Sequence, residues 1–203
     1  MKPILFVVGS VLIMAFISGC ASVATRTDIL CEGPLAGGPL VEVPTAVNPT
    51  PGTVGMIIKA TIKTHPEGFY LLEPKSHMHG KTGFPFVVVI DDKAFEWHDD
   101  GHSEMLPFFD EKGDPMPEGG DGIRYTIEKK VLINQGRHRV TLKLSSEKKS
   151  ITVCAELVGD RESHILEFKP VYNGPETRRF GFLYGVVDMH AFLDGAQLQR
   201  CKD

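Results

Sequence analysis

The chain has 203 residues, 42% of them hydrophobic, and 22 basic against 26 acidic residues give a formal charge of −4. This mildly acidic balance, without basic clusters, argues against nucleic acid as a partner. The length is enough for one sizeable domain or two small ones.

The N-terminus has the three parts of a secretory signal. Lys2 supplies a positive charge, residues 4–17 form a mainly apolar run, and the small residues Ser18 and Gly19 follow. A membrane-spanning helix needs about 20 apolar residues, so this run is too short for a span. We therefore predict a cleaved signal peptide over residues 1–19.

The tetrapeptide Ile17-Ser18-Gly19-Cys20 resembles the lipobox of bacterial lipoproteins. The resemblance implies that the signal is cut before Cys20 and that this cysteine carries acyl chains, which hold a protein on a bilayer without a spanning helix. Ala21 stands where this family has an Asp in proteins kept at the inner membrane. The resemblance thus implies a membrane partner, through a lipid anchor in the bacterial cell envelope, on the periplasmic face of the outer membrane in a Gram-negative cell. The alternative is an ordinary signal peptide with a chance cysteine.

Residues 20–52 are predicted to be the lipidated N-terminus and a tether. Five prolines and four glycines interrupt residues 21–52, so no regular element can continue far through them.

Three cysteines remain besides Cys20, and the oxidising envelope allows one disulfide between them. Cys31 lies near the start of the mature chain and Cys201 near its end. Because chain termini are often close together in a domain, we predict a Cys31–Cys201 disulfide, with pairings to Cys154 as the alternatives.

From residue 53 the hydrophobic pattern takes a period of two, which predicts half-buried strands. Residues 54–63 alternate in this way, and the wholly apolar residues 84–90 read as a central strand. Residues 137–144 and 151–158 flank a turn-like "SSEKK" and predict a hairpin. Further strands are expected at 123–127, 131–134, 165–172, 180–187 and 190–193. No long segment has a helical period, so we predict an all-β, antiparallel, immunoglobulin-like β-sandwich over residues 53–203.

Four segments of this region also suggest a family. They are "FVVVIDDKAF", "VLINQGRHRVTLKL", "SITVCAEL" and "HILEFKPVY". In this order they resemble the PEGA-type and related immunoglobulin-like modules of bacterial surface proteins, over about residues 84–172. The resemblance implies a binding or spacer module without catalytic residues.

The segment "SHMHG" holds the candidate metal ligands His77 and His79. In an extended segment alternate residues face the same way, so both imidazoles can grip one copper or zinc ion. Such a site needs three or four ligands, which Met78, His98 or His102 could complete. The alternative is two solvated loop histidines.

Residues 99–122 carry eight acidic side chains and one lysine. Calcium is bound by such flexible acidic loops, although the spacing does not match an EF-hand, and a solvated loop is the alternative. The apolar residues 105–109 within it are expected to pack under the sandwich edge or to contact a partner.

Other side chains of the strands have two interpretations each. Arg137, Arg139 and Lys143 face outward and fit an anionic partner, or they pair with the outward Glu156. Cys154 shares this face, which indicates that C-terminal strands cover it. Trp97, the only tryptophan, fits either the edge of the core or a ligand platform.

The common catalytic motifs of hydrolases, metalloproteases, phosphate-binding loops and dithiol redox proteins are missing from the sequence. The leading hypothesis is a lipid-anchored envelope protein with a non-catalytic binding or adaptor domain for an envelope protein or glycan. A copper or zinc protein centred on His77 and His79 is the alternative. An envelope hydrolase is the third hypothesis.

Overall fold

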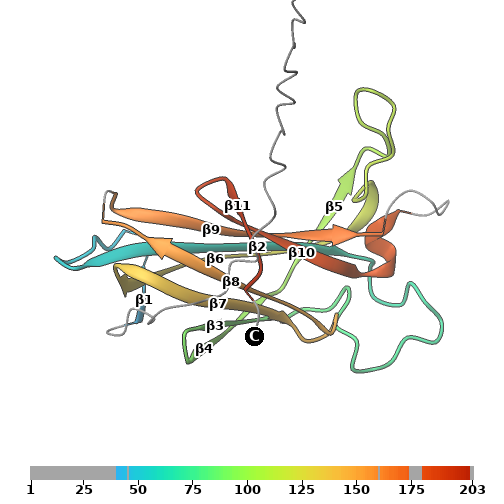
Figure 1. The fold of residues 1–203 in the computed structure, drawn as a ribbon. Coiled ribbons are helices and arrows are strands. Elements are labelled where there is room, and N and C mark those ends of the chain that lie inside the picture. Colours follow the sequence, from blue (N-terminus) through green and yellow to red (C-terminus); the bar gives the residue numbers. More distant parts are fainter. Residues whose placement is uncertain (1–39, 45, 160, 174–179, 202–203) are drawn as a thin grey trace, which may run out of the picture.

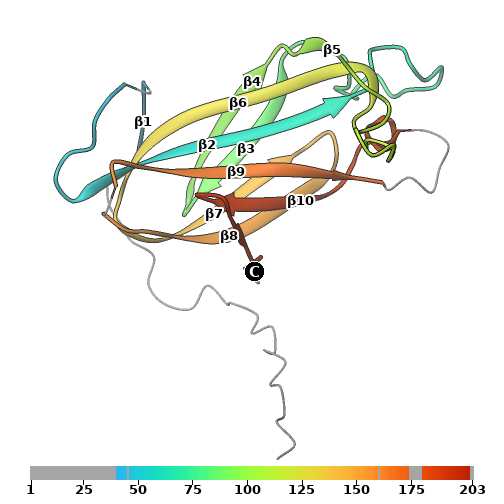
Figure 2. The same cartoon turned by 90° about the horizontal axis from the view of Figure 1, so that it is seen from above.

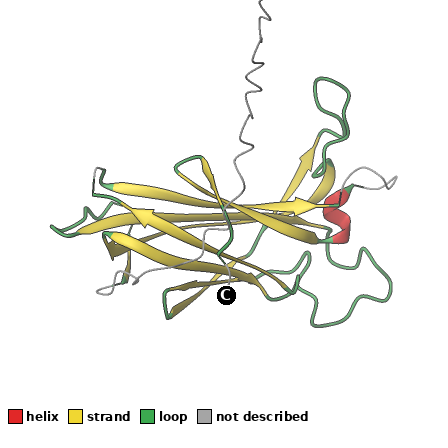
Figure 3. Ribbon diagram, in the orientation of Figure 1, coloured by secondary structure: helices red, strands yellow, loops and turns green. Residues whose placement is uncertain are grey.

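The computed structural model describes residues 40–44, 46–159, 161–173 and 180–201. Two β-sheets pack face to face, with one 3-10 helix, η1 (Gly181–Tyr184), at one end (Figures 1 and 3). The larger sheet has the order β1 (Val41–Val43), β6 (Gly120–Asn134), β2 (Thr53–Thr64), β9 (Ser163–Tyr172), β10 (Val186–Leu193) and β11 (Ala196–Leu198), and β5 (His102–Leu106) also pairs with β6. The smaller sheet has the order β4 (Lys93–Asp99), β3 (Phe84–Ile90), β7 (Gly136–Leu144) and β8 (Lys149–Leu157). The predicted all-β sandwich is confirmed.

The larger sheet is mixed, because β2 pairs in parallel with β9 while its other strand pairs are antiparallel. The prediction of purely antiparallel pairing is therefore wrong for this pair, and the order of the strands is not clearly immunoglobulin-like. Figure 2 shows β2 and β9 running side by side along the length of the sandwich.

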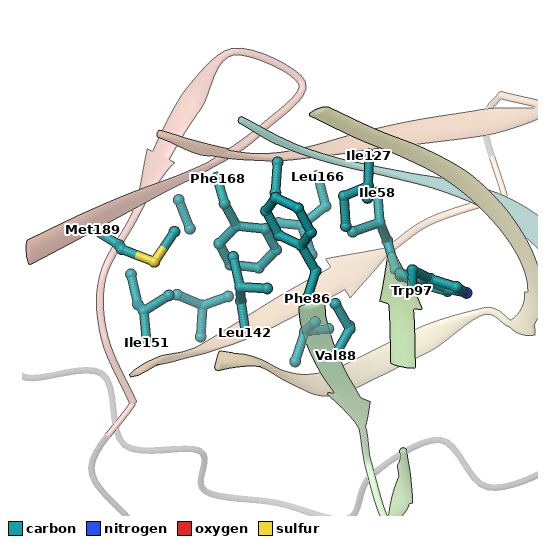
Figure 4. Close-up of a cluster of buried hydrophobic side chains, with 14 of the residues drawn as sticks. Ile58, Phe86, Val88, Trp97, Ile127, Leu142, Ile151, Leu166, Phe168 and Met189 are labelled. Atoms are coloured by element: carbon teal, nitrogen blue, oxygen red, sulfur yellow. The ribbon is translucent and has the colours of Figure 1, made fainter. Parts of the chain in front are cut away.

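The core lies between the two sheets, as the period-two pattern predicted. Along β2 the inward residues Val54, Met56, Ile58, Ala60 and Ile62 are all buried. The opposite sheet contributes Phe86, Val88 and Leu142, and Figure 4 shows these facing Phe168 and Ile58. Trp97 is buried in the same cluster, and its Nε1–H donates to Glu42 at 2.8 Å, which supports the core interpretation of this residue.

Strand β6 joins two segments that were predicted as separate strands. The charged run Glu128-Lys129-Lys130 interrupts the apolar alternation, but each side chain has a partner outside its own strand. Glu128 pairs with Lys59, Lys129 lies 3.5 Å from Glu42, and Lys130 Nζ donates to the Val47 carbonyl. A charged run can therefore continue a strand when its neighbours supply these partners.

The predicted strand over residues 180–187 is wrong in its first half. Residues 181–184 form η1, and Gly185, with φ +80°, reverses the backbone before β10 begins at Val186. This left-handed conformation favours glycine, so the apolar run is divided by a turn. The stretch 96–120 contains most of β4 and all of β5, which were not predicted.

Strand β1 lies within the range assigned to the tether and pairs with β6. The sheet therefore begins before Thr53.

The predicted Cys31–Cys201 disulfide is wrong, because Cys201 is joined to Cys154 with the two Cα atoms 6.1 Å apart. The C-terminal segment runs beside β8, where the Cys201 N–H donates to the Thr152 carbonyl at 2.9 Å. This confirms that a C-terminal segment covers the outer face at Cys154. Cys31 lies outside the described residues.

Two buried histidines hold neighbouring strands to the turns of hairpins. His138 Nδ1 lies 2.9 Å from Asp91, and its Nε2 lies 2.8 Å from the Asn134 carbonyl. His164 repeats this contact with Asp194 at 2.6 Å and with the Val158 carbonyl at 2.8 Å. We call these the two histidine corners.

Candidate metal centre

The loop that connects β2 to β3 brings four metal-ligating side chains together. His65 directly follows the last residue of β2, and Glu73, His77 and His79 come from the loop itself. One donor atom from each residue lies within 4.8 Å of the donor atoms of the other three. We call these residues the four-residue cluster. In Figures 1 and 2 this loop lies at the same end of the sandwich as η1.

The loop closes on itself because of a glycine beside His79. Gly80 has φ +72°, and a Cβ placed there would lie 1.9 Å from the Glu67 backbone nitrogen. Its N–H also donates to the Thr64 hydroxyl at 3.2 Å. Only glycine permits this close approach, which brings His79 back against His65 at the end of β2.

The donor atoms of the cluster form a continuous chain of contacts. His79 Nδ1 lies 2.9 Å from His65 Nε2, His65 Nε2 lies 3.2 Å from Glu73 Oε1, and Glu73 Oε1 lies 2.5 Å from His77 Nδ1. Ligands at the usual zinc distance of 2.0–2.1 Å in a tetrahedron are about 3.3 Å apart. The cluster can therefore surround an ion with small movements of the side chains.

The outer nitrogens of the two buried histidines face oxygen acceptors. His65 Nδ1 lies 3.0 Å from the Pro66 carbonyl, and His79 Nε2 contacts the Glu147 carboxylate. A neutral imidazole has only one N–H, so a ring that donates to its outer oxygen keeps a lone pair on its inner nitrogen. In that tautomer the inner nitrogens of His65 and His79, 2.9 Å apart, and the Glu73 oxygen 3.2 Å from His65 Nε2 all present lone pairs to one another. A cation bound by both lone pairs relieves this repulsion.

Burial lowers the pKa of His65, and the nearby His79 and His77 lower it further against the raising effects of Pro66 and Glu73. A lowered pKa keeps this ring neutral near pH 7, and the neutral imidazole is the form that binds metals.

Glu147 reaches the site from the turn between β7 and β8. Burial raises the pKa of its carboxyl group, but interactions with His79 and the Val186 N–H bring that pKa below its ordinary value. Its second oxygen accepts the Val186 N–H at 3.0 Å, and a Cβ on Gly185 would lie only 2.5 Å from it. Glu147 is therefore held as a carboxylate that orients His79.

Aromatic side chains cover His65 on two sides. Phe69 stacks on its ring with centroids 5.4 Å apart, and Tyr70 approaches edge-on at 5.0 Å. The Tyr70 hydroxyl donates to the Leu183 carbonyl at 3.1 Å, which ties the loop to η1.

The predicted pair His77 and His79 does come together, with ring centroids 3.9 Å apart. The additional ligands suggested for them are elsewhere. Met78 packs against the hydrophobic core, His98 lies on β4 beside Glu96, and His102 lies on β5. The ligands that the sequence did not single out are His65, first after an alternating strand, and Glu73, four residues before His77. No feature of the sequence around Glu147 connects it with these ligands.

The acidic stretch 99–122 forms no second ligand cluster among the described residues. Asp110 accepts the N–H groups of Lys112 and Asp114, and Glu104 and Glu118 both bind Arg124. The calcium hypothesis therefore gains no support from this part of the chain.

The structure also bears on the predictions for two surface features, the basic side chains of β7 and the apolar stretch 105–109. Arg137 Nε lies 3.5 Å from Glu156 on the paired strand, as the ion-pair interpretation predicted. The apolar stretch 105–109 is not packed under the sandwich: Met105, Phe108 and Phe109 are exposed by 66%, 48% and 59%. The packing interpretation is therefore wrong for these three side chains, and contact with a partner stays a prediction.

No family model matches the chain, and neither the curated proteins nor the solved structures contain a match. Among the described residues, no helix has the length and apolar character needed to cross a bilayer. The predicted signal peptide and Cys20 lie outside the described residues.

Proposed function

We propose that this chain is a lipid-anchored cell-envelope protein whose β-sandwich binds a zinc or copper ion at the four-residue cluster. The observation that carries the proposal is the pair of inner nitrogens of His65 and His79, which face each other at 2.9 Å while both outer nitrogens contact oxygens. When the N–H of each ring lies on its outer nitrogen, both inner lone pairs are available to one cation.

The donor set favours a borderline transition metal over calcium or magnesium. Three imidazole nitrogens and one carboxylate oxygen suit zinc and copper, whereas calcium takes six to eight oxygens. Glu147 adds the outer carboxylate that commonly orients a metal-bound histidine.

The envelope location is supported by the lipobox resemblance around Cys20. A Cys20→Ser variant should be released from the membrane fraction into the soluble periplasm. Retention of this variant in the membrane would contradict the lipid anchor.

A binding or adaptor role is a second, compatible proposal. It is supported by two groups of exposed apolar side chains: Leu71 and Leu72 in the loop that holds the cluster, and Met105 of β5 with Phe108 and Phe109 just after it. Exposed apolar groups of this size often mark contacts with other proteins.

The test of the metal site is the metal content of the full chain, produced in a bacterial envelope and purified without a histidine tag or chelator. The variant is His77→Ala, because His77 is the most exposed of the four ligands, with 26% of its side chain accessible. The matched control is His98→Ala, which removes an exposed histidine outside the cluster.

We expect close to one equivalent of zinc or copper in the unmodified protein and in the control. His77→Ala should weaken the affinity by more than the roughly 10–100-fold that loss of an outer partner costs. Equal metal content in His77→Ala and the unmodified protein, or no metal after incubation with zinc or copper, would overturn the proposal.

A further inference from the structure

The four ligands of the cluster line one open pocket of about 570 Å³, and their exposure divides them into two pairs. His65 and His79 form the inner pair, with 1% and 3% of their side chains accessible. Glu73 and His77 form the outer pair, with 13% and 26% accessible. Solvent therefore reaches the centre of the cluster past the outer pair, whereas the inner pair closes it from the protein side.

The two pairs also differ in the groups that hold them. Each inner imidazole has an oxygen partner outside the cluster, the Pro66 carbonyl or the Glu147 carboxylate. The Nε2 atom of His77 has no hydrogen-bond partner among the described residues. Outer partners orient a metal-binding histidine, and their loss typically costs roughly 10–100-fold in affinity. His77 is therefore the histidine of the cluster that is held least firmly.

The outer pair lies on residues 70–77, which we call the flap. In Figures 1 and 2 the loop that contains the flap projects from the end of the sandwich. Leu71 and Leu72 are 100% and 96% exposed, so the flap buries little apolar surface at these positions. Segments with few buried apolar contacts open locally at a low cost in free energy.

Few hydrogen bonds hold the flap closed. Outside the cluster, its links to other described residues are two: the Tyr70 hydroxyl donates to the Leu183 carbonyl at 3.1 Å, and Lys81 Nζ donates to the Lys75 carbonyl at 2.9 Å. The second of these is exposed, so Tyr70 is the main latch. Met78, which packs against the core, follows the flap directly and fixes its other end.

We propose that the cluster exchanges its metal ion with small chelating ligands, and that the flap is the part that moves. When the flap opens, the bonds from the ion to Glu73 and His77 break, and donor atoms of the incoming ligand replace them. His65 and His79 still hold the ion at this stage and release it last. The ion keeps its charge throughout, because only ligands are exchanged.

The pocket has the size of a small-molecule site, and zinc accepts both nitrogen and oxygen donors. A small ligand with such donors is therefore the partner in the exchange. This inference rests on the proposed metal site and gives it the function of metal transfer.

The test measures the transfer of zinc from the loaded full chain to pyridylazoresorcinol, a small chelator that changes colour when it binds zinc. The chelator is present in large excess. Loop motions take nanoseconds to microseconds, so opening of the flap should not limit the rate. We expect the rate to rise in proportion to the chelator concentration and to be unaffected by added metal-free protein. A rate that is independent of the chelator, or slowed by metal-free protein, would overturn the inference, because the ion would then leave before the chelator arrives.

The variant Tyr70→Phe tests the flap. It removes the hydrogen bond to Leu183 but keeps the ring that contacts His65. Because this hydrogen bond breaks on opening, its loss should raise the transfer rate about fivefold. Tyr184→Phe is the matched control, since it removes the hydroxyl of an exposed tyrosine that lines the same pocket. This control should transfer zinc as the unmodified protein does, and equal rates in the two variants would overturn the role of the flap.

Failure of the transfer inference differs from failure of the metal site. If zinc binds but its release does not depend on the chelator, transfer is overturned and the metal site stands. If no zinc binds, the metal site itself is overturned, and transfer with it.

Discussion

The histidine corners and the four-residue cluster both bury imidazole rings, but the ring nitrogens face different groups. In the corners, both nitrogens of His138 and of His164 face oxygen acceptors of the protein. In the cluster, His65 and His79 each direct one nitrogen toward an oxygen and the other toward the second imidazole, and Glu73 Oε1 also lies 3.2 Å from the inner nitrogen of His65. A corner therefore has oxygen partners for both ring nitrogens, whereas in the cluster a cation would give the inner nitrogens a shared partner. Burial of a histidine alone does not identify a metal site; the partners of both nitrogens do.

The largest expected effect is stabilisation of the folded state by zinc. A ligand that binds only the folded state, at 1,000 times its Kd, raises the free energy of unfolding by about 4 kcal/mol. We expect this rise in urea titrations of the unmodified protein, and none in His65→Ala. An equal rise in both proteins would mean that zinc binds elsewhere.

Replacing His138, one of the two corner histidines, should have the opposite effects: the fold should lose stability and zinc binding should remain. His138 is fully buried and joins Asp91 to the Asn134 carbonyl, so His138→Ala leaves these groups without their partner. We expect a loss of about 3 kcal/mol in the free energy of unfolding. The stabilisation by zinc should remain. Loss of zinc binding in a folded His138→Ala protein would contradict the separation between corners and cluster.

The third effect concerns the link between the β7–β8 turn and the metal centre. Glu147→Gln keeps the shape of the side chain but removes the negative charge that orients His79. Loss of such an outer carboxylate typically lowers metal affinity 10–100-fold. Competition with a metal indicator measures this change. Glu67→Gln, which alters an exposed residue of the same loop outside the cluster, should leave the affinity unchanged.

The fold was more predictable than the site because its signal is local. Alternation along residues 54–63 follows from one buried sheet face, and β2 has this alternation. The predictions missed features that depend on distant partners or on backbone conformation, such as the charged middle of β6 and the turn at Gly185. The parallel pairing of β2 with β9 has no local signal either.

The same reasoning explains what was found of the site. His77 and His79 were recognised because they are two residues apart. His65 contacts His79 across 14 positions of the sequence, and Glu147 contacts it across 68. Only the fold brings such residues together. The sequence pattern therefore identified two of the four ligands and did not identify Glu147, which contacts His79 from outside the cluster.

The smallest expected effect is a pH dependence at the second corner. Burial raises the pKa of Asp194, but the Ile165 N–H and His164 bring it below its ordinary value of 3.8. Since the folded protein holds this carboxylate ionised more readily than the unfolded chain does, its contribution is complete above that value. The contribution is lost as the pH falls through 3.8 and then through the lower pKa of the folded state.

Asp194→Asn should therefore be less stable than the unmodified protein by about 1 kcal/mol near neutral pH, because a hydrogen bond to a charged group is lost. The difference should shrink below pH 3.8. Urea midpoints across this range measure it, and Asp92→Asn, in the exposed turn after β3, controls for the change in net charge. A difference that persists unchanged at low pH would show that the corner depends on the shape of Asp194 and not on its charge.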